Sequence, residues 1–73
     1  MDINVILGEV KEFGAECVWK MREECLIAPD SVILVYLQTL MNEKEFEVVL
    51  KYKELMLEEF RKSAKEELEW LNS

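Results

Sequence analysis

Apolar residues recur along the first third of the chain at the spacing of one helical face. Separations of four, three, four, four and four residues link the members of this stripe: Ile6, Val10, Phe13, Cys17, Met21 and Cys25. Because residues three or four apart share one side of an α-helix, the stripe predicts a helix over about residues 2–26, with Asp2 as its N-cap. An irregular start, with the helix beginning near Gly8, is the alternative. Gly14 adjoins the stripe and costs about 1 kcal/mol relative to alanine inside a helix, so close approach of a neighbouring helix is one reason for it.

A second helix is predicted over about residues 30–41. Pro29 cannot continue the preceding helix, but its fixed φ suits the first turn of the next one. Asp30 and Ser31 then place oxygen acceptors at the positive end of that helix. The run from Val32 to Leu37 is apolar nearly all round, so we expect this short helix to be buried on most sides. Its β-branched residues would also suit a strand, but the chain has no second strand-like run to pair with it.

Asn42 marks the start of a third helix. Glu45, three residues later, completes a capping box, and Met41 and Phe46 flank the pair as a hydrophobic staple. A tight hairpin between the second and third helices follows from this position. We expect the third helix to cover about residues 43–71. Its predicted inner face consists of Phe46, Val49, Leu50, Met56, Leu57, Phe60, Ala64, Leu68 and Leu71.

Together these segments predict one all-α domain over residues 1–73, a three-helix bundle in which two long helices clasp a short buried one. A chain of 73 residues buries only about 60% of the surface of its unfolded form. Because 51% of its residues are hydrophobic, we expect apolar side chains to remain exposed and to favour self-association or a partner.

The charge balance narrows the kinds of partner. Nine Lys and Arg residues face sixteen Asp and Glu residues, a formal net charge of -7. Nucleic acid and anionic membrane surfaces are disfavoured, because both are bound mainly through Lys and Arg. A basic partner protein is favoured.

Residues that carry chemistry are scarce. The chain has no histidine, the commonest general base and zinc ligand. The carboxylate pairs, such as Glu23-Glu24 and Glu66-Glu67, fall on predicted solvated faces. We therefore expect no catalytic, cofactor or metal site, and a protein that is not an enzyme.

The two cysteines, Cys17 and Cys25, are predicted to be small buried hydrophobes. On one straight helix they would be separated by about 12 Å, beyond the reach of a disulfide. An intermolecular disulfide or a reactive thiol remains the alternative. Met1-Asp2-Ile3-Asn4 lacks the positive charge of a signal peptide, and no stretch approaches the 18–20 apolar residues of a membrane span. We expect a cytoplasmic, reducing location without membrane association.

Trp70 is the first candidate contact residue. It follows Glu69 near the end of the third helix, where apolar neighbours are few, and an exposed tryptophan is a typical interface residue. A fold-closing contact with the first helix is the alternative. The predicted protein interface is Trp70, Leu71, Leu68 and Trp19.

Two stretches, residues 15–30 with their closing Pro29-Asp30 and residues 37–56 with their short turn, resemble helical repeats of the tetratricopeptide and pentatricopeptide type. The resemblance covers about one and a half repeats and implies a helical hairpin. Val35 stands where such a unit presents a polar base-reading residue, and Val48 and Val49 stand where it has a small alanine.

These observations predict a protein–protein interaction module, a small acidic adaptor, inhibitor or regulatory protein that self-associates, plausibly as a homodimer. One alternative is an acidic mimic of nucleic acid that inhibits a DNA- or RNA-handling enzyme. The other, implied by the resemblance, is an RNA-binding fragment of a helical-repeat protein.

Overall fold

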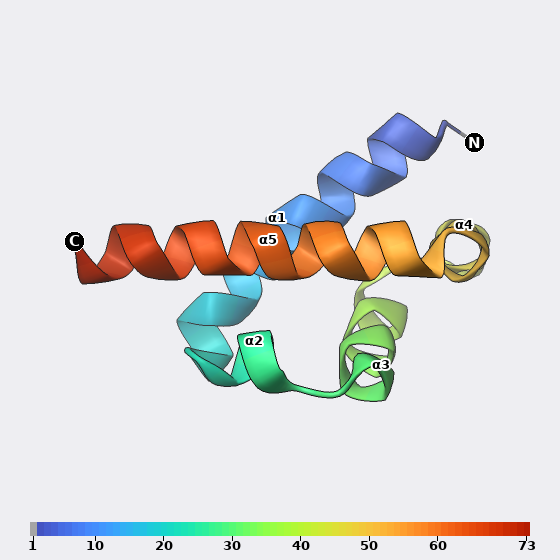
Figure 1. Cartoon of the computed structure of the whole chain (residues 1–73). Coiled ribbons are helices and arrows are strands. Elements are labelled where there is room, and N and C mark those ends of the chain that lie inside the picture. The colour runs from blue at the N-terminus through green and yellow to red at the C-terminus, as the bar shows by residue number, and fades with distance from the viewer. Residues whose placement is uncertain (1) are drawn as a thin grey trace.

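The computed structural model describes residues 2–73, and within them the chain forms helices and no strand. The predicted all-α class is confirmed. Five helices follow one another along the chain (Figure 1): α1 (Ile3–Met21), α2 (Glu24–Ile27), α3 (Asp30–Leu40), α4 (Glu43–Lys51) and α5 (Lys53–Asn72).

The two longest helices, α1 and α5, pack on each other and form the centre of the fold. They cross while running in the same direction (Figure 1). An ideal Cβ on Gly14 would overlap the backbone carbonyl oxygen of Phe60 and would lie 3.1 Å from its carbonyl carbon. The backbone of α5 therefore occupies the space that a side chain at Gly14 would need. The close approach suggested by the sequence is confirmed.

Most of the predicted inward positions form a single core. Phe13 and Met21 of the first stripe are only half-buried, whereas the other members are buried. Leu50, predicted to face inward, is 49% exposed, so that assignment is wrong. The buried hydrophobic residues are Ile6, Val10, Cys17, Val18, Cys25, Ile33, Leu37, Met41, Val49, Met56, Leu57, Phe60, Ala64 and Leu68.

The first helix was predicted to extend to about residue 26, but α1 ends at Met21. Arg22 has φ 52° and ψ -134°, and Glu23 has φ -60° and ψ -23°. These angles are close to those of the two central residues of a type II′ turn, whose first position is usually glycine. The chain therefore turns back before α2. Arginine has no preference for this turn position, so the sequence did not predict a turn at Arg22. Asp2 caps α1 as predicted, because its carboxylate accepts a hydrogen bond of 2.9 Å from the backbone N–H of Asn4.

The predicted third helix is two helices, divided at Tyr52. Tyr52 has φ -114° and ψ 39°, which interrupts the helix without a loop. Its N–H still donates to the carbonyl of Val48, and its own carbonyl accepts from Met56, so few hydrogen bonds are lost. One helix over this whole segment would be about 45 Å long. The longest dimension of the molecule is 36 Å, and the break keeps both halves within it.

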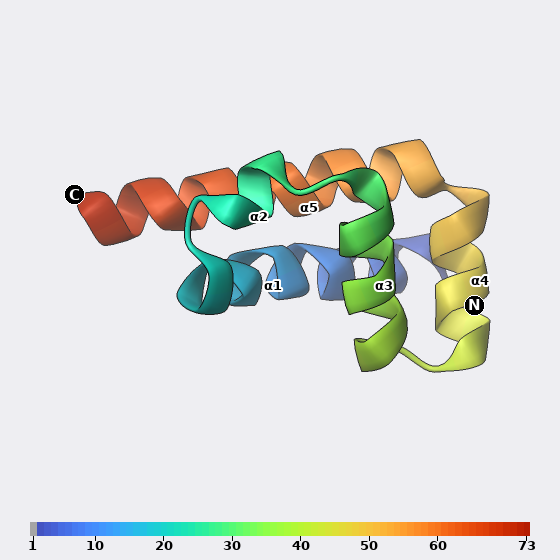
Figure 2. The ribbon, with the colours of Figure 1, turned by 90° about the horizontal axis from the view of Figure 1, so that it is seen from below.

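The capping box at Asn42 is present. The Glu45 N–H donates to Asn42 Oδ1 at 2.9 Å, and the Asn42 N–H donates to Glu45 Oε1 at 3.0 Å. As a result α3 and α4 form the tight hairpin that the sequence predicted (Figure 2).

The short apolar helix α3 is not clasped between two long helices, which corrects the predicted arrangement. Only Ile33 and Leu37 are buried, whereas Val35 is 59% exposed and Val32 is 44% exposed. Because α1 and α5 pack directly on each other, α3 lies outside their contact (Figure 2). The start of α3 is tied to α5 by Arg61, whose Nη1 lies 2.8 Å from Asp30 Oδ1.

Candidate protein-interaction surface

Two exposed tryptophans lie at one end of the contact between α1 and α5. Trp19 is 58% exposed and Trp70 is 67% exposed. The indole Nε1–H of Trp19 donates to Glu67 Oε2 at 2.8 Å. Glu67 lies three residues before Trp70 on α5, so the two side chains share one flank of that helix. We call Trp19, Glu67 and Trp70 the indole end.

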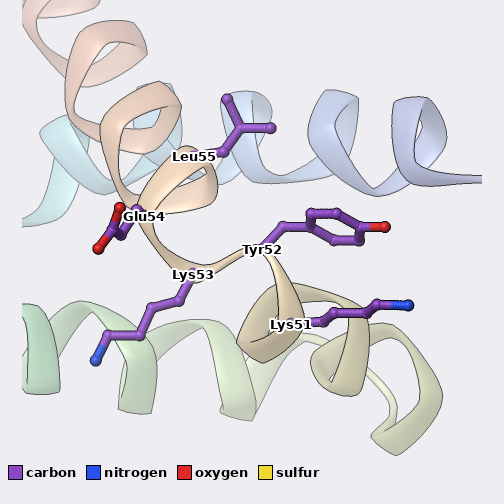
Figure 3. Close-up of a pocket in the computed structure, with 5 residues that line it drawn as sticks. All are labelled: Lys51, Tyr52, Lys53, Glu54 and Leu55. Carbon is purple, nitrogen blue, oxygen red and sulfur yellow. The ribbon is translucent and has the colours of Figure 1, made fainter.

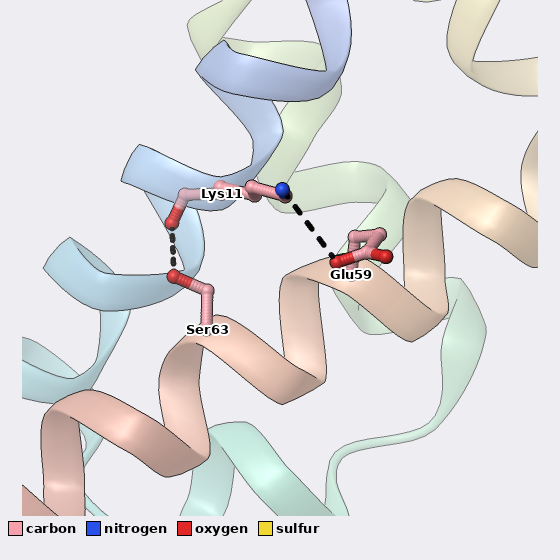
Figure 4. Close-up of polar contacts among 3 residues, drawn as sticks. All are labelled: Lys11, Glu59 and Ser63. Atoms are coloured by element: carbon pink, nitrogen blue, oxygen red, sulfur yellow. Dashed lines mark hydrogen bonds and ion pairs between the residues drawn. The ribbon is translucent and has the colours of Figure 1, made fainter.

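Polar contacts along the same flank fix how α1 and α5 lie against each other. The Ser63 hydroxyl donates to the backbone carbonyl of Lys11 at 2.6 Å, and Lys11 Nζ lies 4.0 Å from Glu59 Oε2 (Figure 4). Glu59, Ser63 and Glu67 recur every four residues, and Lys11 and Trp19 are two turns apart on α1. The position of Trp19 relative to α5 is therefore set by a row of contacts rather than by one bond.

The other two predicted interface residues turn inward. Leu68 is 8% exposed and belongs to the core, and Leu71 is half-buried against it. At this end of α5, Leu68 packs into the core, while the Trp70 side chain is mostly exposed to solvent. The predicted set consequently divides into two exposed indoles and two residues that hold the helix beneath them.

The break at Tyr52 creates a second surface that the sequence analysis missed. Lys51, Tyr52, Lys53, Glu54 and Leu55 line an open hollow of about 510 Å³ where α4 meets α5 (Figure 3). We call it the elbow hollow. Tyr52 and Leu55 are each 39% exposed, and Lys51 Nζ lies 5.6 Å from the centre of the Tyr52 ring. The continuous helix predicted over this segment gave no reason to expect a concave surface here.

Three of the seven basic side chains outside this hollow contact a carboxylate or an aromatic ring in the described chain. The two ion pairs within 4.0 Å among residues 2–73 are Lys11 with Glu59 and Arg61 with Asp30. Lys20 Nζ lies 5.8 Å from the centre of the Tyr36 ring. Within the described chain, the lysines of the elbow hollow have no carboxylate at ion-pair distance.

Both cysteines are free and fully buried, as the sequence predicted. The turn at Arg22 folds α2 back, so the two thiols do not lie on one straight helix. Cys17 donates to Met21 Sδ at 3.4 Å, and Cys25 donates to the carbonyl of Arg22 at 2.9 Å. Burial, with a smaller contribution from the charge of Cys25, raises the pKa of Cys17 to about 11. Burial also raises the pKa of Cys25. At neutral pH both are thiols, which are weak nucleophiles.

The Glu45 carboxylate of α4 lies close enough to Glu9 of α1 to affect its pKa. Burial raises the pKa of Glu9, and a hydrogen bond with Glu45, the negative charge of Glu45 and that of Glu12 raise it further. The Glu45 carboxylate already accepts the N–H of Asn42, so it serves both the helix cap and this contact. Glu12 and Glu16 continue the acidic face of α1 into solvent.

Tyr36 of α3 carries a buried hydroxyl oxygen that has no hydrogen-bond partner among residues 2–73. Its ring packs edge-on against Phe60, with ring centres 6.1 Å apart and an interplanar angle of 77°. Burial raises the pKa of this hydroxyl, with smaller contributions from Cys17 and Glu16. Tyr36 therefore acts as a core-edge residue that connects α3 to α5.

Among residues 2–73, no three His, Cys, Asp or Glu side chains gather closely enough to hold a metal ion. Within the same residues, no helix combines the length and the apolar character required to cross a membrane. The structure thus defines a small all-α domain with exposed indoles at one end and a lysine-flanked hollow at the other. No protein-family model, curated protein or solved structure matches this chain, so the resemblance to helical repeats is not confirmed.

Proposed function

We propose that this protein is a non-enzymatic interaction module, a small acidic adaptor, inhibitor or regulatory protein, that binds partner proteins and copies of itself through the indole end. The observation that carries the proposal is the exposure of Trp19 and Trp70 on one flank of the central helix pair. Tryptophan is enriched among the residues that dominate binding energy at protein interfaces. The exposed part of each indole is apolar surface that a partner protein can cover.

The size of the molecule is consistent with such a role. A stable interface covers about 800 Å² on each partner. The described chain exposes 4808 Å², so an ordinary interface would cover about a sixth of its surface. Each buried tryptophan supplies roughly 150–250 Å² of the interface. The two indoles would therefore form the centre of the contact, with polar neighbours at its rim.

The state of association can be followed through indole fluorescence. Both tryptophans of the chain belong to the indole end. In the unmodified protein we expect their emission to shift to shorter wavelength as the protein concentration rises, because association removes the indoles from water. Light scattering on the unmodified protein should show the accompanying rise in mass.

Trp70→Ala tests the choice of surface. We expect this variant to remain monomeric at concentrations where the unmodified protein associates. Val35→Ala is the matched control, since Val35 is also exposed but lies on α3. A monomeric unmodified protein would remove self-association from the proposal, and Trp70→Ala that associates normally would remove the indole end.

A second candidate function is mimicry of nucleic acid by the acidic face of α1. The specific observation is that Glu12 and Glu16, both exposed, follow Glu9 along one side of α1 at helical spacing. Binding of this kind to a basic groove weakens steeply with salt, whereas an apolar contact does not. Affinity for a DNA- or RNA-handling enzyme that is unchanged between low and high salt would contradict it.

A further inference from the structure

The charges around Trp70 are unfavourable for a symmetric contact. Glu66 and Glu67 lie one helical turn before Trp70, and Glu69 directly precedes it. In a two-fold dimer with the two α5 helices side by side and parallel, each of these carboxylates would face the same carboxylate of the second copy, with Lys65 as the nearest cation in the sequence. Like charges brought together across an interface are destabilising. A surface that receives Trp70 should instead be positively charged.

The elbow hollow has the complementary character. Lys51 extends beside Tyr52, with its Nζ 5.6 Å from the ring centre, whereas Lys53 extends to the other side of the break, where Glu54 also lies (Figure 3). Tyr52 and Leu55 provide partly exposed apolar surface, and Lys51 and Lys53 have no carboxylate within 4.0 Å in the described chain. A lysine placed over an indole ring also gains a favourable cation–π contact.

We propose that the indole end of one copy docks into the elbow hollow of a second copy, with Glu66, Glu67 and Glu69 facing Lys51 and Lys53. This inference rests on the self-association proposed above and names the surface that receives Trp70. Glu54, which lines the same hollow, is the one carboxylate there that opposes the contact. Glu54→Gln should therefore strengthen association, and added salt should weaken it.

The placement of the two surfaces determines the kind of assembly. Trp70 is near the C-terminal end of α5, and the elbow hollow lies at its N-terminal end. Figure 1 shows these two ends of α5 at opposite sides of the molecule. The helix has 20 residues and is therefore about 30 Å long. Because two different surfaces meet, the contact is head-to-tail. It generates open chains or closed rings rather than a two-fold dimer.

Complementation of two defective variants tests this arrangement. Trp70→Ala retains the hollow but lacks the indole, and Lys51→Glu with Lys53→Glu retains the indole but reverses the charge of the hollow. Sedimentation velocity should show each variant alone as a monomer, with an apparent Kd raised by more than about tenfold, equivalent to about 1.4 kcal/mol. An equimolar mixture should form a one-to-one heterodimer, because one intact contact remains.

Lys44→Glu is the control, since it reverses the charge of an exposed lysine of α4 that belongs to neither surface. All the substituted side chains are exposed, and circular dichroism should confirm that each variant keeps its helices. One outcome separates the two proposals. If Trp70→Ala is monomeric but the Lys51→Glu, Lys53→Glu variant associates normally, the head-to-tail contact is wrong and the proposed function still stands. A mixture that stays monomeric would also overturn the head-to-tail contact. Normal association of both variants would exclude both proposals.

Discussion

Helix α3 is rich in apolar residues but mostly exposed, whereas α5 is rich in charged residues but forms much of the core where it crosses α1. α3 is the most apolar part of the chain, yet only Ile33 and Leu37 are buried there. α5 carries many charges, but it buries Met56, Leu57, Phe60, Ala64 and Leu68. The difference shows that a narrow apolar stripe on a long helix, not the total number of apolar residues, determines which helix occupies the centre.

Length and small residues explain the outcome. Two long helices can bury a continuous row of side chains against each other, whereas the 11 residues of α3 span only about 16 Å. Gly14 allows the backbones of α1 and α5 to come closer than a side chain would permit. Once these two helices are in contact, α3 can cover only one side of the pair, and its remaining apolar face stays exposed.

Gly14→Ala should destabilise the α1–α5 crossing, the more closely packed of the two regions. The added methyl group would meet the backbone carbonyl of Phe60, which cannot turn aside as a flexible side chain would. We expect a loss of about 1–3 kcal/mol in the free energy of unfolding, larger than the helix-propensity gain of alanine. Urea denaturation followed by circular dichroism measures it.

Gly8→Ala provides the control on the same helix. A Cβ at Gly8 has no heavy atom within 4 Å, so only the propensity term remains, and we expect a gain of up to about 1 kcal/mol. Equal effects at the two glycines would show that the crossing is not closely packed.

Arg22→Gly should sharpen the comparison by stabilising the turn that follows α1. Arg22 has φ 52° and ψ -134°, a sparsely populated combination that costs an L-residue about 1–3 kcal/mol and that glycine adopts freely. Glycine also gives the unfolded chain more freedom, which offsets about 0.4–1 kcal/mol of the gain. We expect a net increase of about 0.5–1 kcal/mol, measured as a higher urea midpoint. Arg22→Ala, which retains the Cβ, should give no such increase.

The two helix breaks show where sequence patterns lose information. Some helix boundaries lie at residues with strong local backbone preferences. Pro29 directly precedes α3, and Asn42 caps α4 together with Glu45, so both starts could be predicted. Arg22 and Tyr52 have no such preference. Their backbone angles are imposed by tertiary packing, which a periodic pattern in one chain does not contain.

The same limit applies to the surfaces. The sequence left open whether Trp70 would stay exposed or would close the fold against the first helix, and in the structure its side chain is 67% exposed. The hydrogen bond from Trp19 to Glu67 joins residues 48 positions apart, and the elbow hollow exists only because the chain bends at Tyr52. A helical pattern can place a residue on a face, but it does not say which faces meet.

Glu9→Gln tests the weaker contact between α1 and α4, and its effect should be smaller because the carboxylates are partly solvated. The pKa of Glu9 is raised above its ordinary value of 4.5, so the folded state binds its proton more readily than the unfolded state. This contribution to stability is therefore complete below pH 4.5 and is lost as the pH rises through the folded pKa. We expect the unmodified protein to gain more stability than Glu9→Gln when the pH is lowered from about 7 to about 5. Parallel urea midpoints in the two proteins would contradict this assignment.

The smallest effect is expected on the outer face of α3. Val35→Ala removes more side chain than Ile33→Val, but Val35 is 59% exposed and Ile33 is 1% exposed. We expect the first change to alter the free energy of unfolding by less than about 0.5 kcal/mol and the second to cost about 0.5–1.5 kcal/mol. Thermal unfolding of both variants decides the point. A large loss of unfolding free energy in Val35→Ala would mean that another surface covers this face of α3 in solution. The contrast between α3 and the α1–α5 crossing would then hold only for a single copy of the chain.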